Sequence, residues 1–222
     1  MSKVVIIDYQ LGNMFSVLNA CLHIGMDVEI SAEKSKIMAA DAVILPGVGA
    51  FADAMHNLEK LDLISPIKDF VATNKPFLGV CLGLQLLFEE SEEFGANKGL
   101  GLVKGVVKKF PNQFENNHNI KVPQISWNTI AKPNNENADL WRNTPLSDIP
   151  EHSFMYFVHS FFVQPSEKQD IITETTYENI KYCSGIKKNN IFATQFHPEK
   201  SAKLGLQLYK NWFEQIPHLI IK

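Results

Sequence analysis

The sequence predicts an α/β fold: a mainly parallel sheet flanked by helices, with an antiparallel extension in the second half. In the first half, short apolar segments alternate with amphipathic ones, which is the pattern of strands joined by crossover helices. Several of these strands are apolar throughout, as VVII and AVIL are, which is expected when helices cover both faces of a parallel sheet. After Gly101, strand-like stretches follow one another with little helix before Leu204.

The first half contains four predicted strands, residues 3–7, 27–30, 42–45 and 77–80. Apolar residues recur at helical spacing after Gly12-Asn13, and further helical patterns follow Phe51, Pro66 and Cys81. Candidate helices thus follow the first and the third of these strands, as the crossover connections of a parallel sheet require.

The second half contains five strand-like stretches, residues 101–110, 152–163, 170–177, 180–186 and 190–196. We expect antiparallel strands joined to the edge of the parallel sheet. Two Asn-rich segments, residues 111–119 and 133–139, are predicted to be surface loops. Because neither a repeat nor a dividing linker is visible, residues 1–222 are predicted to form a single domain.

Composition excludes several functional classes. The net charge is −3 and the longest basic runs are dipeptides, so no nucleic-acid partner is expected. The first apolar run is only four residues long and no segment approaches membrane-spanning length, which predicts a cytoplasmic protein without membrane contact. The three cysteines are an odd number without metal-ligand spacing, so neither a disulfide framework nor a zinc site is favoured. No metal and no cofactor are expected.

Cys81 lies between two glycines at the predicted change from strand to helix. The segment GVCLG has the form of a nucleophile elbow with sulfur in place of oxygen. The N–H groups at the start of the following helix would favour a thiolate, and the Leu82 amide could hold an oxyanion. The alternative is a structural cysteine buried in an ordinary turn.

The segment TQFHPEKS supplies the partners that a cysteine nucleophile needs. His197 could manage the proton of the thiol, and Glu199 could fix the tautomer of the imidazole. The alternatives are a core or capping histidine for His197 and a solvated helix residue for Glu199. Because the chain contains seven histidines, spacing alone does not select His197.

LPGVGAF is a further glycine-rich turn at a strand end, where α/β sheets bind ligands, although it could be a plain turn. It lacks the Lys-Ser or Lys-Thr pair of a phosphate loop.

Six motifs in chain order carry a resemblance to one family. GVCLGLQLL, TQFHPEKS and LPGVGAF together resemble class I glutamine amidotransferases, whose domain has a flavodoxin-like core. IDYQLGN, VPQISWN and YFVHSFF resemble the glutaminase subunits of imidazole glycerol phosphate synthases. The resemblance runs from Ile7 to Ser201, which is nearly the whole chain.

The resemblance implies a hydrolysis of glutamine to glutamate and ammonia. Cys81 would attack the side-chain amide, His197 would pass the proton to the leaving ammonia, and Glu199 would orient His197. A glutamyl thioester would form and be hydrolysed by water. The positions implied to hold the glutamine and its oxyanion are Gly47, Val48, Gly49, Leu82, Gln85, Glu93, His159, Ser160 and Phe161.

Without the resemblance, Gln85 and Glu93 would be interpreted as solvated faces of a helix, and His159 as a strand histidine without a known role. The chemistry of the substrate agrees with part of the implied set. A zwitterionic amino acid needs a carboxylate for its ammonium group and amides for its own carboxylate.

The resemblance also implies a partner. Ammonia released into neutral water is mostly protonated, so such glutaminases form a heterodimer with a (β/α)8-barrel cyclase that makes imidazole glycerol phosphate and AICAR in histidine biosynthesis. Asn13, Trp127 and Asn128 are implied to face that cyclase, although Trp127 could equally be a core aromatic. Gln124 and Ser126 stand where the family commonly has histidine and glycine. Because this stretch lies near the partner in the family, the departure bears on which synthase subunit the chain would bind.

Three other functions compete with this interpretation. A paralogous glutaminase could feed a different synthase, such as one that forms an amidine on a nucleotide-activated surface sugar, and only its partner-facing surface would differ. A regulatory domain without catalysis would be expected to lack Cys81, His197 or Glu199. A cysteine peptidase would not need the PGVG turn, Gln85 and Glu93. Cys21 and Cys183 are predicted to be structural, the first on a helix and the second in a strand.

Overall fold

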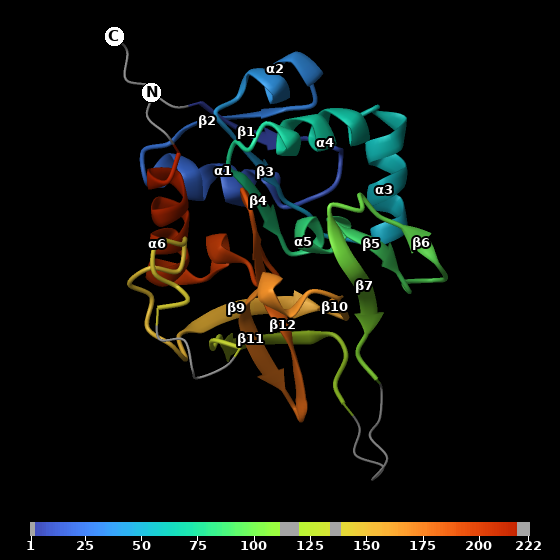
Figure 1. The fold of residues 1–222 in the computed structure, drawn as a ribbon, viewed down its shortest axis with the longest axis vertical. Coiled ribbons are helices and arrows are strands. Elements are labelled where there is room, and N and C mark those ends of the chain that lie inside the picture. The colour runs from blue at the N-terminus through green and yellow to red at the C-terminus, as the bar shows by residue number, and fades with distance from the viewer. Residues whose placement is uncertain (1–2, 112–119, 134–138, 217–222) are drawn as a thin grey trace.

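The computed structural model describes residues 3–111, 120–133 and 139–216, and it confirms the mainly parallel sheet with flanking helices and a smaller antiparallel part (Figure 1). Within the described residues, one large sheet has the strand order β2-β1-β3-β4-β13-β12-β10-β7-β5-β6, and β11 pairs with β12. Strands β8 and β9 form a separate two-stranded sheet. Most of the two predicted Asn-rich loops, residues 112–119 and 134–138, lies outside the described part.

The parallel part of the sheet contains strands from both ends of the sequence. It consists of β1 (Lys3–Ile7), β2 (Asp27–Ser31), β3 (Ala42–Leu45), β4 (Phe77–Val80) and β13 (Ile191–Thr194). Residues 190–196 were expected among the antiparallel strands joined to the edge of the parallel sheet, and for the pairing with β4 this expectation was wrong. β13 runs parallel to β4 and antiparallel to β12, and its four residues are all buried. A continuous apolar segment such as IFAT is suited to this central position.

The antiparallel part follows β13. It contains β12 (Ile180–Lys188), β11 (Ile171–Tyr177), β10 (Phe161–Pro165) and β7 (Val103–Lys109), with the short strands β5 (Phe88–Ser91) and β6 (Asn97–Lys98) at the far edge. Strand β5 is itself parallel to β7. The predicted stretch 152–163 is divided at Ser160 into β9 (Phe154–His159) and β10, and β9 leaves the large sheet to pair with β8 (Gln124–Thr129).

Six α-helices are present in the described residues: α1 (Met14–His23), α2 (Lys34–Ala39), α3 (Phe51–Lys60), α4 (Ile64–Ala72), α5 (Leu82–Leu86) and α6 (Ala202–Glu214). Two 3₁₀ turns, η1 (Lys168–Asp170) and η2 (Pro198–Lys200), complete the helical elements. Helix α5 is shorter than the apolar pattern suggested, because the chain returns to a strand at Phe88. No described helix combines the length and apolar character needed to cross a membrane.

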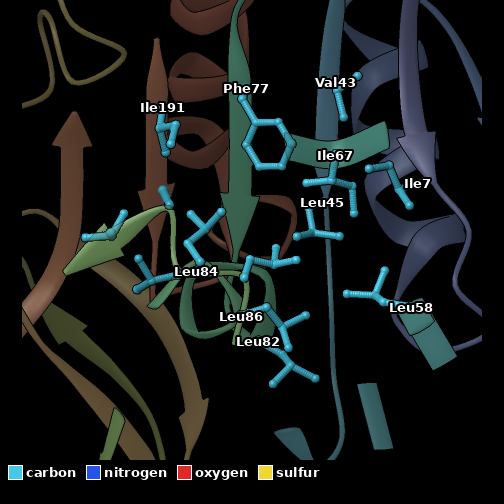
Figure 2. Close-up of a cluster of buried hydrophobic side chains, with 14 of the residues drawn as sticks. Ile7, Val43, Leu45, Leu58, Ile67, Phe77, Leu82, Leu84, Leu86 and Ile191 are labelled. Carbon is cyan, nitrogen blue, oxygen red and sulfur yellow. The ribbon is translucent and has the colours of Figure 1, made fainter. Parts of the chain in front are cut away.

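Two buried clusters cover the two faces of the parallel sheet. Side chains alternate along β1, so Val5 and Ile7 belong to one cluster and Val4 and Ile6 to the other. The first cluster contains the apolar faces of α3, α4 and α5, and Figure 2 shows Leu82, Leu84 and Leu86 packed beneath the ends of the central strands. The second contains α1 and α6. Helix α5, which follows Cys81, is therefore held rigidly against the sheet.

Candidate active site

Cys81 occupies a strained turn between β4 and α5. Its backbone has φ 55° and ψ −107°, a conformation that a residue with a Cβ rarely adopts. The turn is held by the Cys81 N–H, which donates to the Thr194 carbonyl of β13 at 2.7 Å, and by the Cys81 carbonyl, which accepts from the Leu84 N–H at 3.0 Å. This is the strained geometry of a nucleophile elbow.

The glycines around Cys81 are required by close backbone approach. A Cβ on Gly83 would overlap the carbonyl oxygen of Leu45, and a Cβ on Gly79 would lie 3.0 Å from the Ala193 Cβ and 3.1 Å from the Gly83 carbonyl oxygen. Because the nearest atoms are mostly backbone, no side-chain rotation would relieve these contacts. The G-x-C-x-G spacing therefore allows α5 to pack directly on β3 and β4.

The substitution Gly83→Ala should lower the free energy of unfolding by about 3 kcal/mol or more, because α5 must move away from β3 to admit the methyl group. Urea denaturation followed by circular dichroism measures the loss. Gly25→Ala is the matched control: its position is open but has φ +81°, so a loss of about 1 kcal/mol is expected. Equal losses in the two variants would contradict the close-packing argument.

His197 and Glu199 form a buried pair beside the end of β13. Nδ1 of His197 lies 2.7 Å from Oε1 of Glu199, and the two side chains are 1% and 0% exposed. A carboxylate accepts only, so Nδ1 carries the proton of this hydrogen bond. Nε2 of His197 is buried without a hydrogen-bond partner among the described residues. It is therefore the nitrogen available for proton exchange with Cys81.

The electrostatics of this pair favour a protonated imidazole. Burial by itself lowers the pKa of His197, but attraction to a negative Cys81 and hydrogen bonding and attraction to Glu199 outweigh it, raising that pKa from 6.5 to about 10. An imidazolium facing a thiolate is the active form of a cysteine–histidine pair.

Asn13 lies inside this arrangement. Its Nδ2 donates to Oε1 of Glu199 at 2.9 Å, the same oxygen that holds His197, and the Tyr209 hydroxyl lies 3.5 Å from Oε2. The sequence motif had suggested that Asn13 faces a partner. In the folded chain its amide also contacts the carboxylate that orients His197.

A cavity of about 370 Å³ opens at Cys81. Eight of the nine residues predicted to hold substrate line it: Val48, Gly49, Leu82, Gln85, Glu93, His159, Ser160 and Phe161. Its remaining lining residues are Cys81, Pro123, Val158 and Lys200. Segments that lie far apart in the sequence thus meet in one small cavity, whose size suits a free amino acid.

Gly47 lies just behind the cavity and shapes its wall. A Cβ at this position would overlap the Tyr9 hydroxyl and lie 2.8 Å from the Leu82 Cβ. The Gly47 carbonyl accepts a hydrogen bond from the Leu82 N–H at 3.3 Å, so the amide suggested for the oxyanion is engaged. Because a trans peptide is planar, the Val48 N–H points away from Leu82 in this conformation.

The interpretation of Gln85 and Glu93 as solvated faces of a helix was wrong for both. Gln85 lies on α5 but is buried, and its Nε2 donates to the Phe161 carbonyl at 2.9 Å. Glu93 follows β5, and its Oε2 accepts from the Phe51 N–H at 2.6 Å. Burial raises the pKa of Glu93, and the negative charge of Asp53 raises it further, whereas the hydrogen bond from Phe51 lowers it.

His159 is a neutral, structural part of the cavity wall. Burial is the main cause that lowers its pKa to about 4, so the ring is neutral. Because the Phe161 carbonyl only accepts, Nδ1–H donates to it at 2.8 Å, and Nε2 faces the Tyr182 hydroxyl at 3.2 Å. Tyr182 in turn contacts Gln124, which is fully buried. The glutamine that replaces the usual histidine in QISWN is thus an internal residue.

The other residues of that motif have different environments. Trp127 is 49% exposed, which excludes the alternative of a core aromatic. Asn128 donates from Nδ2 to the Thr176 carbonyl at 2.9 Å.

Cys21 and Cys183 are buried free thiols in the two core clusters, and burial raises the pKa of each to about 12, so both are poor nucleophiles at neutral pH.

Sequence reasoning missed Gln195. This residue is fully buried, and its Nε2 lies 3.7 Å from Sγ of Cys81. No pattern in the sequence marks it, because β13 ends at Thr194 and the period of the strand does not extend to residues 195 and 197. In the part of the chain that the structure describes, no group of three or more His, Cys, Asp or Glu side chains could hold a metal ion.

A buried Cys–His–Glu set at a strand-to-helix turn, beside a small cavity in an α/β sheet, is the arrangement of a hydrolytic or amide-transferring cysteine enzyme. The family model for class I glutamine amidotransferases matches residues 5–216, and the chain belongs to this family. Among solved structures, PurLQS from Thermotoga maritima has a TM-score of 0.72 at 16% identity and covers 97% of this chain and 99% of that chain, which supports the fold.

More similar sequences carry a more particular name. The chain is 41% identical over 214 residues to imidazole glycerol phosphate synthase subunit HisH 1 of Legionella pneumophila strain Lens, covering 96% of this chain and 100% of the relative. It is 42% identical over 218 residues to subunit HisH of Moorella thermoacetica, covering 98% and 97%.

Proposed function

We propose that this chain is the glutaminase subunit of an imidazole glycerol phosphate synthase. The observation that carries the proposal is Cys81 in the wall of a cavity of about 370 Å³, with the buried His197–Glu199 pair near enough for Cys81 and His197 to attract each other, in a chain about 40% identical to HisH proteins over nearly their full length. The proposal takes the chain as one glutamine amidotransferase domain working in cytoplasmic histidine biosynthesis.

The reaction follows from the three side chains. Sγ of Cys81 adds to the side-chain amide carbon of glutamine, and the tetrahedral intermediate collapses as His197 gives its Nε2 proton to the departing ammonia. The product is a glutamyl thioester. Water, deprotonated by the now neutral His197, hydrolyses it to glutamate and restores Cys81. Glu199 keeps Nδ1 protonated throughout.

The cavity wall supplies groups for both ends of the amino acid. We assign the Glu93 carboxylate to the α-ammonium group of glutamine, and the backbone N–H groups around Gly49 and Ser160–Phe161 to its α-carboxylate. These groups lie on separate segments, so only the folded chain presents them together.

Regulation is proposed to act through the Gly47–Val48 peptide. Rotating this peptide would release the Leu82 N–H from the Gly47 carbonyl and turn the Val48 N–H toward Leu82, which provides two donors for the oxyanion. A partner that binds the rotated form more tightly would raise the rate by shifting the population. The isolated chain would then be a weak glutaminase.

The outer face of the two-stranded sheet is the proposed docking surface for the (β/α)8-barrel cyclase. Ile125, Trp127 and Phe154 lie on this face by the β8–β9 register and are 57%, 49% and 59% exposed. Val158, directly opposite Ile125, lines the cavity at Cys81. A partner docked on this apolar face would lie beside the site of ammonia release and form a heterodimer.

The test is glutamate release from glutamine by the purified chain, alone and then with the cyclase subunit and its ribotide ligand. We expect stimulation by about 100-fold, because the partner must shift the oxyanion peptide. A sample in which the cyclase is combined with Cys81→Ala chain measures the background. Glutaminase activity that never responds to the cyclase would overturn the histidine-pathway assignment while leaving the chemistry of Cys81 intact.

A further inference from the structure

We propose that Gln195 is a catalytic hydrogen-bond donor that favours the thiolate of Cys81, and that Gln85 holds it in the donating orientation. This inference rests on the proposed function, since it concerns the nucleophile of that reaction. It assigns a role to a side chain outside the Cys–His–Glu set.

The position of Gln195 is set by the sheet. The residue directly follows β13, its backbone N–H donates to the Ser184 carbonyl at 2.9 Å, and its side chain has no exposed surface. Nε2 lies 3.7 Å from Sγ of Cys81, within hydrogen-bond range for sulfur. A fully buried amide in this place has little freedom to move.

The orientation of the amide follows from a neighbour that cannot rotate. The carbonyl of Phe161 is an acceptor only, so the group of Gln85 that lies 2.9 Å from it must be the NH₂. The same NH₂ lies 3.1 Å from the side-chain amide of Gln195, which must therefore present its oxygen. The NH₂ of Gln195 is left facing the sulfur.

The reversed orientation is disfavoured on two counts. It would bring the NH₂ groups of Gln85 and Gln195 together in a buried site, and it would place an amide oxygen against the sulfur. The first arrangement loses a hydrogen bond without access to water, and the second sets an acceptor against a sulfur that can only accept when it is a thiolate. The chain from the Phe161 carbonyl through Gln85 to Gln195 therefore ends in a donor at Cys81.

A donor at this place acts on the charged form of the sulfur. The protonated thiol can donate to the Val158 carbonyl, 3.9 Å away, whereas a thiolate can only accept. The Gln195 NH₂ thus stabilises the thiolate selectively, and hydrogen bonds to charged groups are the stronger kind. His197 holds the proton that leaves, while Gln195 exchanges none.

The experiment measures the rate at which iodoacetamide alkylates Cys81 at pH 7, by mass spectrometry of the peptide that contains it. Gln195→Met removes the donor at similar size, and Gln195→Glu replaces it with an acceptor. We expect both to slow alkylation by about 10-fold or more, and kcat to fall by a similar factor with KM little changed. Gln164→Met, on an exposed strand position, is the matched control and should react as the parent chain does.

Circular dichroism and thermal unfolding establish that each variant is folded. Should Gln195→Met not fold, the nearly isosteric Gln195→Glu decides the question. A folded variant that alkylates at the parent rate would overturn the role of Gln195. If the parent chain never releases glutamate, even with the cyclase, while Gln195→Met still slows alkylation, the proposed function fails and the role of Gln195 stands.

Discussion

Replacing Cys81 with alanine should reduce glutamate release from glutamine by at least about 1000-fold, both in the isolated chain and with a cyclase present. In the proposed mechanism the sulfur forms the thioester, and Ser160, the one hydroxyl that lines the cavity, has no imidazole bonded to it among the described contacts. Glutamate is measured by a coupled dehydrogenase assay on freshly purified chain.

The control for this change is Cys21→Ala. Cys21 lies on the buried face of α1, and burial raises the pKa of its thiol to about 12, so it takes no part in the proposed reaction and turnover should be largely retained. Substantial turnover by Cys81→Ala would refute the thioester mechanism. Loss of activity in Cys21→Ala with unchanged folding would contradict the structural role of Cys21.

Replacing His197 with alanine should lower kcat by about 100- to 10,000-fold, because the leaving ammonia then lacks a proton donor and the thiolate lacks its counter-ion. The effect should appear in kcat more than in KM, since His197 does not line the cavity. His23→Ala, in the last turn of α1, is the control and should leave both constants unchanged.

The pH profile tests the same pair. The pKa of His197 is raised to about 10 by Cys81 and Glu199 against the effect of burial, so the imidazolium is present at neutral and mildly alkaline pH and is lost as the pH rises through about 10. The alkaline limb of the rate should therefore lie near pH 10. A limb near 6.5, the ordinary value of an unpaired histidine, would contradict the ion pair.

The strands of the first half could be predicted because their cause is local. Apolar runs such as AVIL are continuous only where both faces are buried, and helical spacing between them implies parallel crossovers. The placement of β13 could not be predicted in this way. β13 pairs with β12 on one side and with β4 on the other, and β4 belongs to a distant part of the sequence. This pairing depends on burying both faces of β13, which no local pattern shows.

The candidate nucleophile and its partners could be predicted from their motifs, because the chemistry of a thiolate requires an imidazole and a carboxylate whatever the fold. The burial of Gln85, the hydrogen bond from Asn13 to Glu199 and the contact of Gln195 with Cys81 were not predictable. Glutamine and asparagine are common on surfaces, and their spacing does not distinguish a solvated amide from a buried one.

The sequence by itself determined the class of fold, the candidate reacting side chains and the resemblance to a glutaminase, since each depends on residue type and short-range order. Only the tertiary structure decided which amides point at which atoms. It engages the Leu82 N–H with the Gly47 carbonyl, and it turns Gln195 toward the sulfur through Gln85 and Phe161. Hydrogen bonds are directional over about 3 Å, so their partners are set by packing between distant segments.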